Sequence, residues 1–153
     1  MSNEKVKQLV RDYLKEAKMM QLATSLDDQP WVCNVWFASD DDLNIYWFSS
    51  TNRRHSKEIL GNNKVGAAIV LPQTPKDPPR GLQLQGVAQV LTKKEDIERA
   101  ISVYRDRVFP IEDINELMED EETPHKFYKI TPNQFVLFDA VNFGDDWRQE
   151  LNL

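Results

Sequence analysis

Residues that commonly build metal sites and disulfides are scarce in this chain. Its 153 residues include one cysteine, Cys33, and two histidines, His55 and His125. An internal disulfide is therefore excluded, and the histidines and cysteine show no metal-ligand spacing. A single cysteine also fits a reducing compartment. The sequence predicts a cytoplasmic protein without a metal site.

Long apolar runs and excess positive charge are absent as well. No stretch of about 18 apolar residues could cross a bilayer, and Met1–Lys5 lacks the basic-then-apolar pattern of a signal peptide. The formal net charge is −6, from 25 acidic and 19 basic residues. Proteins that bind nucleic acids or anionic membranes usually need a basic face. We therefore expect neither as a partner.

Aromatic residues, by contrast, are abundant. The chain has 4 Trp, 4 Tyr and 7 Phe, which provide large flat apolar surfaces suited to a dimer interface or a planar ligand. We expect Trp31, Trp36 and Trp47 to lie in the core or at an interface. The length predicts one domain over residues 1–153, built around a single core.

Hydrophobic periodicity predicts a helix followed by antiparallel strands. The helix covers residues 3–18, and the strands cover 19–25, 31–38, 43–48, 64–71, 81–91, 125–130 and 134–139. The strand over 31–38 is apolar on both faces except at Asn34, so we expect it to be buried on both sides. Thr92 and Glu95 form the pattern of a capping box and open a helical insertion over 92–118. The pattern favours a mainly β barrel of roughly six to seven strands with peripheral helices.

The segment from Trp47 to Lys57 is the most informative one for function. An apolar strand runs into the hydroxyl-rich turn Ser49–Asn52, and then into a helix start that carries Arg53, Arg54 and His55. Helix N-termini offer unpaired N–H groups and a partial positive charge, so added guanidinium groups favour phosphate binding. The alternative is a solvated helix face that pairs with the many acidic residues of the chain.

In this order the segments resemble the FMN-binding split-barrel family that includes pyridoxamine 5′-phosphate oxidase. The resemblance runs from Met20 to Asp139 and is best over Phe48–Val65. The stretch Arg80–Gly86 and the pattern Tyr104…Arg107-Val108-Phe109-Pro110 resemble a branch of the family other than the oxidase itself.

The resemblance implies an antiparallel Greek-key split barrel that forms a homodimer, with FMN between the subunits. It assigns Arg53, Arg54 and His55 to the flavin phosphate, with His55 at a position where the family normally has lysine. Histidine is only partly charged near neutral pH, so this contact would be weaker or sensitive to pH. The resemblance also assigns the ribityl chain and the isoalloxazine ring to a further group of residues: Phe48, Ser49, Asn34, Val35, Trp36 and Gln83.

Two departures argue against pyridoxine chemistry. Cys33 stands where the oxidase carries an arginine, and the tail Trp147–Glu150 lacks the oxidase's Arg-x-His. Cys33 is expected to be a buried apolar residue, and His125 a surface residue beside an acidic run.

The function that we expect is an FMN-dependent oxidoreductase for a small molecule that the sequence does not specify. No side chain is assigned a catalytic role, because the flavin would supply the chemistry. Two alternatives remain open. One is a non-catalytic protein that binds or senses flavin or haem, and the other is a deazaflavin-dependent reductase.

Overall fold

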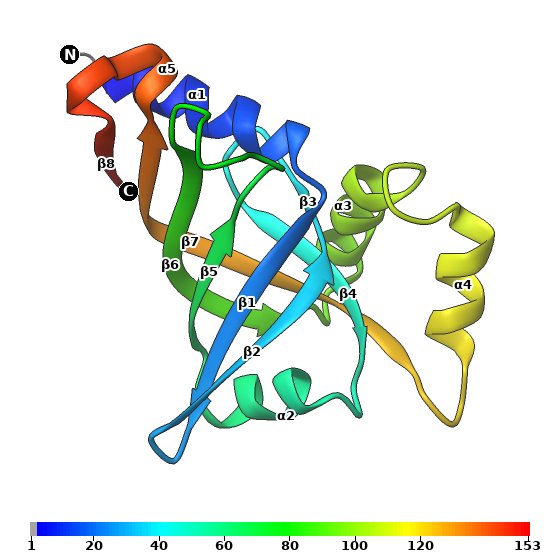
Figure 1. The fold of residues 1–153 in the computed structure, drawn as a ribbon. Helices are drawn as coiled ribbons and strands as arrows, with labels where there is room; N and C mark the ends of the chain where they lie inside the picture. The colour runs from blue at the N-terminus through cyan, green and yellow to red at the C-terminus, as the bar shows by residue number, and fades with distance from the viewer. Residues whose placement is uncertain (1–2) are drawn as a thin grey trace.

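The alternating strands form an antiparallel sheet that curls into a half-barrel (Figure 1). The computed structural model describes residues 3–153, and its strand order is β2-β1-β5-β6-β7-β4-β3, with β8 beside β7. The predicted mainly β, antiparallel fold is confirmed. The strands are β1 (Met19–Leu26), β2 (Gln29–Trp36), β3 (Ala38–Ser39), β4 (Ile45–Ser50), β5 (Lys64–Ile69), β6 (Arg80–Val90), β7 (His125–Asp139) and β8 (Arg148–Asn152).

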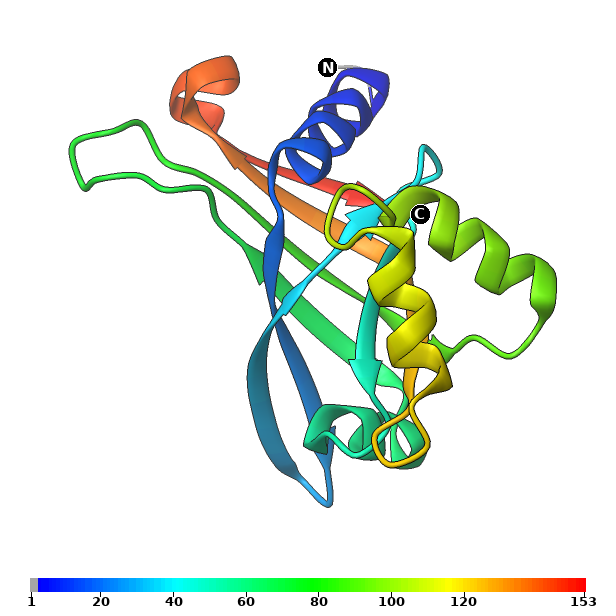
Figure 2. The same ribbon diagram turned by 90° about the vertical axis from the view of Figure 1, so that its right-hand side faces the viewer.

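Helices cover the ends and one side of the sheet. In Figures 1 and 2, α1 lies across one end of the half-barrel, α2 lies at the opposite end, and α3 and α4 stand beside β4. None of the helices in residues 3–153 combines the length and the apolar character needed to cross a membrane. The helices are α1 (Asn3–Glu16), α2 (Arg54–Gly61), α3 (Lys94–Tyr104), α4 (Ile111–Glu119) and α5 (Ala140–Phe143), followed by the 3₁₀ turn η1 (Gly144–Asp146).

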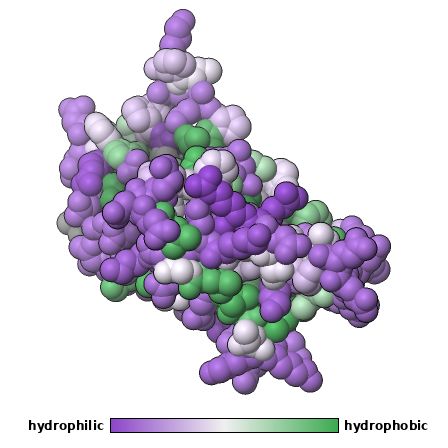
Figure 3. All heavy atoms as spheres, turned by 90° about the horizontal axis from the view of Figure 1, so that it is seen from below, coloured by the Kyte–Doolittle hydropathy of each residue, from purple (hydrophilic) through white to green (hydrophobic). Residues whose placement is uncertain are grey.

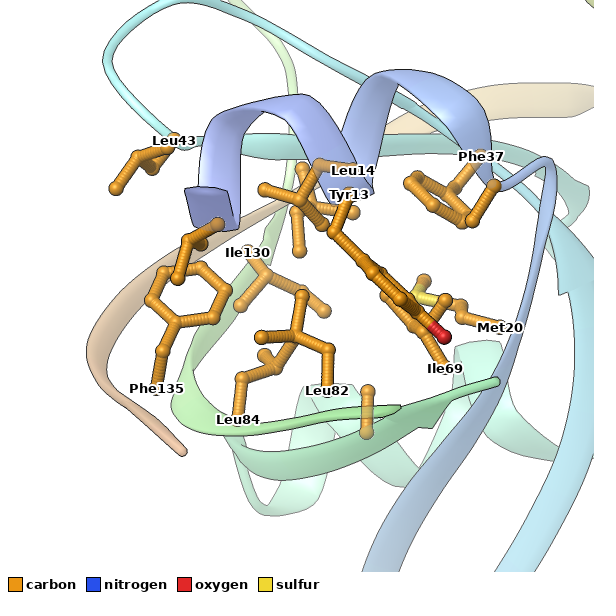
Figure 4. Close-up of a cluster of buried hydrophobic side chains, with 14 of the residues drawn as sticks. Tyr13, Leu14, Met20, Phe37, Leu43, Ile69, Leu82, Leu84, Ile130 and Phe135 are labelled. Atoms are coloured by element: carbon orange, nitrogen blue, oxygen red, sulfur yellow. The ribbon is translucent and has the colours of Figure 1, made fainter. Parts of the chain in front are cut away.

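The larger core fills the inside of the curl and is closed by α1. In Figure 4 the Tyr13 ring of α1 runs towards Ile69 of β5, and Leu82 and Leu84 of β6 lie below Leu14. All of these side chains are buried. The Tyr13 hydroxyl also accepts a hydrogen bond of 2.8 Å from the backbone N–H of Leu71. The apolar stripe predicted for the first helix is therefore the surface that seals the half-barrel.

A second core lies on the outer face of β4 and β7, beneath α3 and α4. Tyr46, Phe48 and Phe127 pack there with Tyr104 and Ile114. Because one face of β4 meets the inner core and the other meets this second core, all six of its residues are buried.

The prediction that strand 31–38 is buried on both faces is wrong. Most of this segment belongs to β2, an edge strand, and seven of the eight residues of β2 are exposed or only partly buried. Only the last two residues of the predicted strand, Phe37 and Ala38, are fully buried. Trp31, Val32 and Trp36 remain 41%, 59% and 47% exposed. The apolar residues on both faces of β2 therefore do not indicate a central strand. The strand that is covered on both faces is β4.

The last two predicted strands form one continuous strand, β7. Gln85 pairs with Gln134, whereas the next residue, Gly86, pairs with Pro132, so Asn133 forms a bulge. A bulge accommodates the proline, which cannot donate to the ladder. Gly86 allows the close approach here, since an added Cβ would collide with Thr131 O and lie 2.8 Å from the Cα of Pro132.

Two other details of the prediction also fail. The C-terminal strand β8 was not predicted, because its polar sequence gains strand geometry only by pairing with β7. The predicted capping box does not form: α3 begins at Lys94, and its N-cap Lys93 makes no side-chain cap.

Candidate ligand cavity at the start of α2

A cavity of about 520 Å³ opens beside the N-terminus of α2. Figure 3 views the end of the molecule at which α2 lies, and apolar surface there runs between hydrophilic groups. The cavity is built by β2, the end of β4, the start of α2, the α3–α4 region and the start of β7. Its lining residues are Trp31, Cys33, Asn34, Val35, Trp36, Phe48, Ser49, Ser50, Arg53, Arg54, His55, Tyr104, Phe109, Leu117 and His125.

Eight of the nine residues that the sequence assigned to a cofactor line this one cavity. They come from two strands and one helix, which only the fold brings together, and they are Asn34, Val35, Trp36, Phe48, Ser49, Arg53, Arg54 and His55. The ninth, Gln83, is exposed on β6 and lines a separate hollow with Val70 and Phe138. Within one subunit Gln83 is therefore apart from the other eight.

The start of α2 has the features of an anion site. Arg53 is the N-cap residue, its backbone is extended, and no side chain caps the first turn. The uncapped N–H groups and the helix dipole therefore remain available to an anion at the cavity wall. The Arg53 side chain is exposed, and it makes no ion pair within residues 3–153. Arg53 is thus the guanidinium most available to a ligand.

Arg54 is held in place from two sides. Its Nε donates to Oε2 of Glu58 at 3.0 Å, and its guanidinium carbon lies 4.0 Å from the centre of the Trp31 ring. Glu58 is fixed in turn by Thr24, whose hydroxyl donates to Oε1 at 2.8 Å. These hydrogen bonds, that from Arg54 first, lower the pKa of Glu58. Arg54 therefore reaches the cavity as half of an ion pair.

His55 contributes a hydrogen bond more than a charge. The residue is buried, and its Nε2 lies 3.0 Å from Oγ of Ser49. Burial, and then the positive charge of Arg53, lower the pKa of His55. The imidazole is accordingly neutral near pH 7, so the local positive charge comes from the two arginines alone.

The cavity also has an aromatic wall. The Phe48 ring lies 6.1 Å from Tyr104 and 5.2 Å from His125, and Tyr104 lies 6.1 Å from Phe109, all measured between ring centroids. His125, expected at the surface, is half-buried and lines the cavity, because β7 pairs Ser50 with His125. Cys33 also lines the cavity and is half-buried.

Sequence reasoning missed this aromatic wall almost entirely. Tyr104, Phe109 and Leu117 belong to the helical insertion, some fifty or more residues after β4 along the chain. The only available signal was the Tyr104…Phe109 pattern, which indicated a branch of a family without indicating a place in the fold.

Comparison with known proteins identifies the family of this chain. A family model described as pyridoxamine 5′-phosphate oxidase matches residues 6–138. The chain belongs to this family. A UPF0306 protein of Haemophilus ducreyi is 24% identical over 93 residues, which cover 60% of this chain and 64% of the relative. The chain thus spans less than two thirds of that relative's length.

Solved structures show the same fold. HutZ, the haem storage protein of Vibrio cholerae, is 20% identical, with 85% of this chain and 92% of that chain covered and a TM-score of 0.70. A FAD-binding protein of Mesorhizobium loti is 16% identical, with 84% and 90% covered and a TM-score of 0.63. Identities this low establish the split-barrel fold alone, and two different ligands are named among these neighbours.

Proposed function

We propose that this member of the pyridoxamine 5′-phosphate oxidase family binds FMN in the α2 cavity and acts as an FMN-dependent oxidoreductase on a small molecule. One observation supports the proposal above all: Ser49, the uncapped start of α2 and Arg53, which has no ion pair within residues 3–153, all border one cavity with aromatic walls. A dianionic phosphate at one end of a flat ring system has the complementary shape and charge.

The residues present fit FMN. Arg53, Arg54 and the first-turn N–H groups would hold the phosphate, with Ser49 and Ser50 beside it. Trp36 and Phe48 would provide apolar surface for the ring, and the extended backbone of Asn34 and Val35 would lie along it. When bound, FMN would supply hydride and electron transfer.

The chain's own part in that function is to bind, orient and exclude water. The Trp31–Arg54–Glu58 contacts fix one guanidinium before any ligand arrives, which reduces the ordering cost of binding. The neutral His55 orients the Ser49 hydroxyl. No proton transfer by a protein group is needed to account for the binding.

We also propose that the protein is a homodimer and that the partner covers the exposed part of the site. Three large apolar side chains of the edge strand β2, namely Trp31, Val32 and Trp36, are 41% or more exposed. An exposed apolar edge strand of this length invites association. Gln83, which lies outside the cavity of its own subunit, would then be available to the partner's site. Sedimentation velocity of the wild type and of Val32→Glu would test this proposal, because a monomeric wild type contradicts it.

The decisive experiment compares FMN with riboflavin, which lacks the phosphate. Quenching of flavin fluorescence should show that wild type binds FMN much more tightly, and the preference should shrink about tenfold or more in Arg53→Ala, as expected for the loss of a charge-assisted contact. Lys126→Ala, which removes a positive charge outside the cavity, serves as the control. Equal affinity of the wild type for both flavins would refute the phosphate assignment.

The single cysteine offers an independent test of the same cavity. Cys33 lines it, so bound FMN should slow alkylation of the thiol by iodoacetamide. If FMN slows the alkylation of Cys33 and inorganic phosphate alone does not, the flavin ring lies near β2. An unchanged rate at saturating FMN would contradict binding in this cavity.

One observation favours haem as a second candidate ligand. His125 lines the cavity, and its Nδ1 lies 3.0 Å from the Thr123 carbonyl oxygen, which leaves Nε2 as the free ring nitrogen. Histidine ligands of metals commonly have their second nitrogen bonded in this way. Absorbance spectra after incubation with each cofactor and desalting separate haem, FMN and a deazaflavin. A Soret band that is retained by wild type and lost in His125→Ala would favour the haem-binding alternative.

A further inference from the structure

The aromatic wall of the cavity contains a buried hydroxyl group without a partner among residues 3–153. Tyr104 is 1% exposed, and its hydroxyl makes no hydrogen bond within residues 3–153. Tyr13 and Tyr46 are equally buried, yet their hydroxyls bond to Leu71 N and to Asp40. Buried tyrosine hydroxyls usually find a partner. The Tyr104 hydroxyl therefore requires a separate explanation.

This hydroxyl is not sealed inside the protein, and it belongs to a residue that lines the cavity. Across residues 3–153, the enclosed side-chain atoms that lack a partner are Trp47 Nε1 and Arg107 Nε, and the Tyr104 hydroxyl is not among them. Tyr104 is also one of the residues that line the cavity. Burial raises the pKa of Tyr104, so its hydroxyl stays protonated and able to donate at physiological pH. A ligand in the cavity can thus accept a hydrogen bond from it.

His125 presents a complementary group. A carbonyl oxygen can only accept, so the Nδ1 that lies 3.0 Å from Thr123 O carries the hydrogen. In the neutral imidazole the other nitrogen, Nε2, is then an acceptor. The rings of His125 and Tyr104 both pack against Phe48, at centroid distances of 5.2 Å and 6.1 Å. One wall of the cavity therefore offers a donor and an acceptor beside an aromatic surface.

The positive charge of the cavity comes from one short segment. The arginines that line it, Arg53 and Arg54, both belong to the start of α2, whereas Phe109 and Leu117 contribute apolar walls. Such walls disfavour a second ionised group on the ligand, since its burial without a partner would be costly. The ligand edge bound here must be planar, uncharged and able both to accept and to donate.

We propose that Tyr104 and His125 bind the lactam edge of a planar heteroaromatic ring. The Tyr104 hydroxyl donates to the ring carbonyl, and Nε2 of His125 accepts from the neighbouring ring N–H. This inference rests on the proposed function only in taking the cavity to be a ligand site. The lactam edge belongs either to the flavin ring itself or to a second reactant bound beside it, and the two sources differ in their competition with FMN.

The test uses 2-quinolinone, an uncharged planar lactam, on flavin-free protein, with binding followed by isothermal titration calorimetry. Its matched partner is 1-methyl-2-quinolinone, which retains the carbonyl and lacks the N–H. Wild type should prefer 2-quinolinone by about 2- to 12-fold, the equivalent of one hydrogen bond. That preference should disappear in His125→Phe. Tyr104→Phe should weaken both probes by a similar factor.

Tyr13→Phe is the control, because this equally buried tyrosine lies outside the cavity and should leave both affinities unchanged. Circular dichroism shows whether each variant is folded. Absent binding of 2-quinolinone to wild type, equal affinity of the two probes, or wild-type affinity in both cavity variants would overturn the inference.

Saturating FMN then identifies the source of the lactam. If FMN displaces 2-quinolinone competitively, the edge belongs to the flavin ring; if both bind together, it belongs to a second reactant. Binding of the probe that depends on Tyr104 and His125, in a protein that fails to bind FMN, would support this inference while refuting the proposed cofactor. Tight FMN binding by a protein that does not bind the probe would support the proposed cofactor and refute this inference.

Discussion

The guanidinium carbon of Arg54 lies 4.0 Å from the centre of the Trp31 ring. This contact joins the edge strand β2 to the first turn of α2 through side chains. Arg54 is also bonded to Glu58 on its other side, at 3.0 Å. The arginine is thus positioned in advance, and its charge is partly compensated before a ligand arrives.

Glu58→Gln should strengthen phosphate binding. Glu58 competes with an anion for Arg54, and the neutral amide removes that competition while it still accepts a hydrogen bond from Thr24. We expect the dissociation constant for FMN to fall about two- to fivefold at low salt, the scale of a partly exposed ion pair. Riboflavin should bind unchanged. Weaker FMN binding in the variant would show that Glu58 acts mainly by holding Arg54 in place.

His55 should make stability depend on pH. Because its folded-state pKa lies below the ordinary value of 6.5, its neutral form is favoured in the fold. Its contribution is therefore fully present above pH 6.5 and is lost as the pH falls through the lowered pKa. Urea denaturation at pH 7.5 and pH 5 should show a smaller loss of stability in His55→Gln than in wild type. An equal loss in both proteins would contradict the assignment.

Gly86→Ala should destabilise the sheet at the β7 bulge. An added Cβ would meet backbone atoms, including the Cα of Pro132 at 2.8 Å, and backbone cannot move as a side-chain tip can. We expect a loss of about 1–3 kcal/mol in the free energy of unfolding, as for overpacked cores. Gly66→Ala is the matched control, since its nearest contact would be 3.6 Å away. Urea midpoints of both variants provide the comparison.

Arg107→Ala should destabilise the C-terminal end of α1. The Nη2 of Arg107 lies 3.2, 2.8 and 2.6 Å from the carbonyl oxygens of Leu14, Lys15 and Ala17. Losing these charge-assisted contacts should cost about 1.5–3 kcal/mol. Arg105→Ala removes only an exposed ion pair with Asp106 and should cost about 0.5 kcal/mol or less. Similar thermal shifts in the two variants would show that α1 does not need the Arg107 contacts.

Local patterns predicted most elements and part of the candidate site. The apolar stripe of α1 and the alternation along β6 depend on the period of each element, so the sequence is enough to predict them. The same holds for the basic start of α2, where Arg53, Arg54 and His55 are adjacent. The sequence could not predict how much charge remains there, because the burial of His55 and the pairing of Arg54 depend on β4, β2 and Thr24.

By itself, then, the sequence determined the antiparallel strands, the closing helix and the hydroxyl-to-arginine turn, because hydrophobic period and turn chemistry act over a few neighbouring residues. Tertiary structure alone decided that β4, and not β2, is covered on both faces, since that depends on where α3 and α4 dock. It also decided that Tyr104 and His125 flank Phe48. Residues this far apart in the chain meet only through long-range strand pairing, which local propensity does not encode.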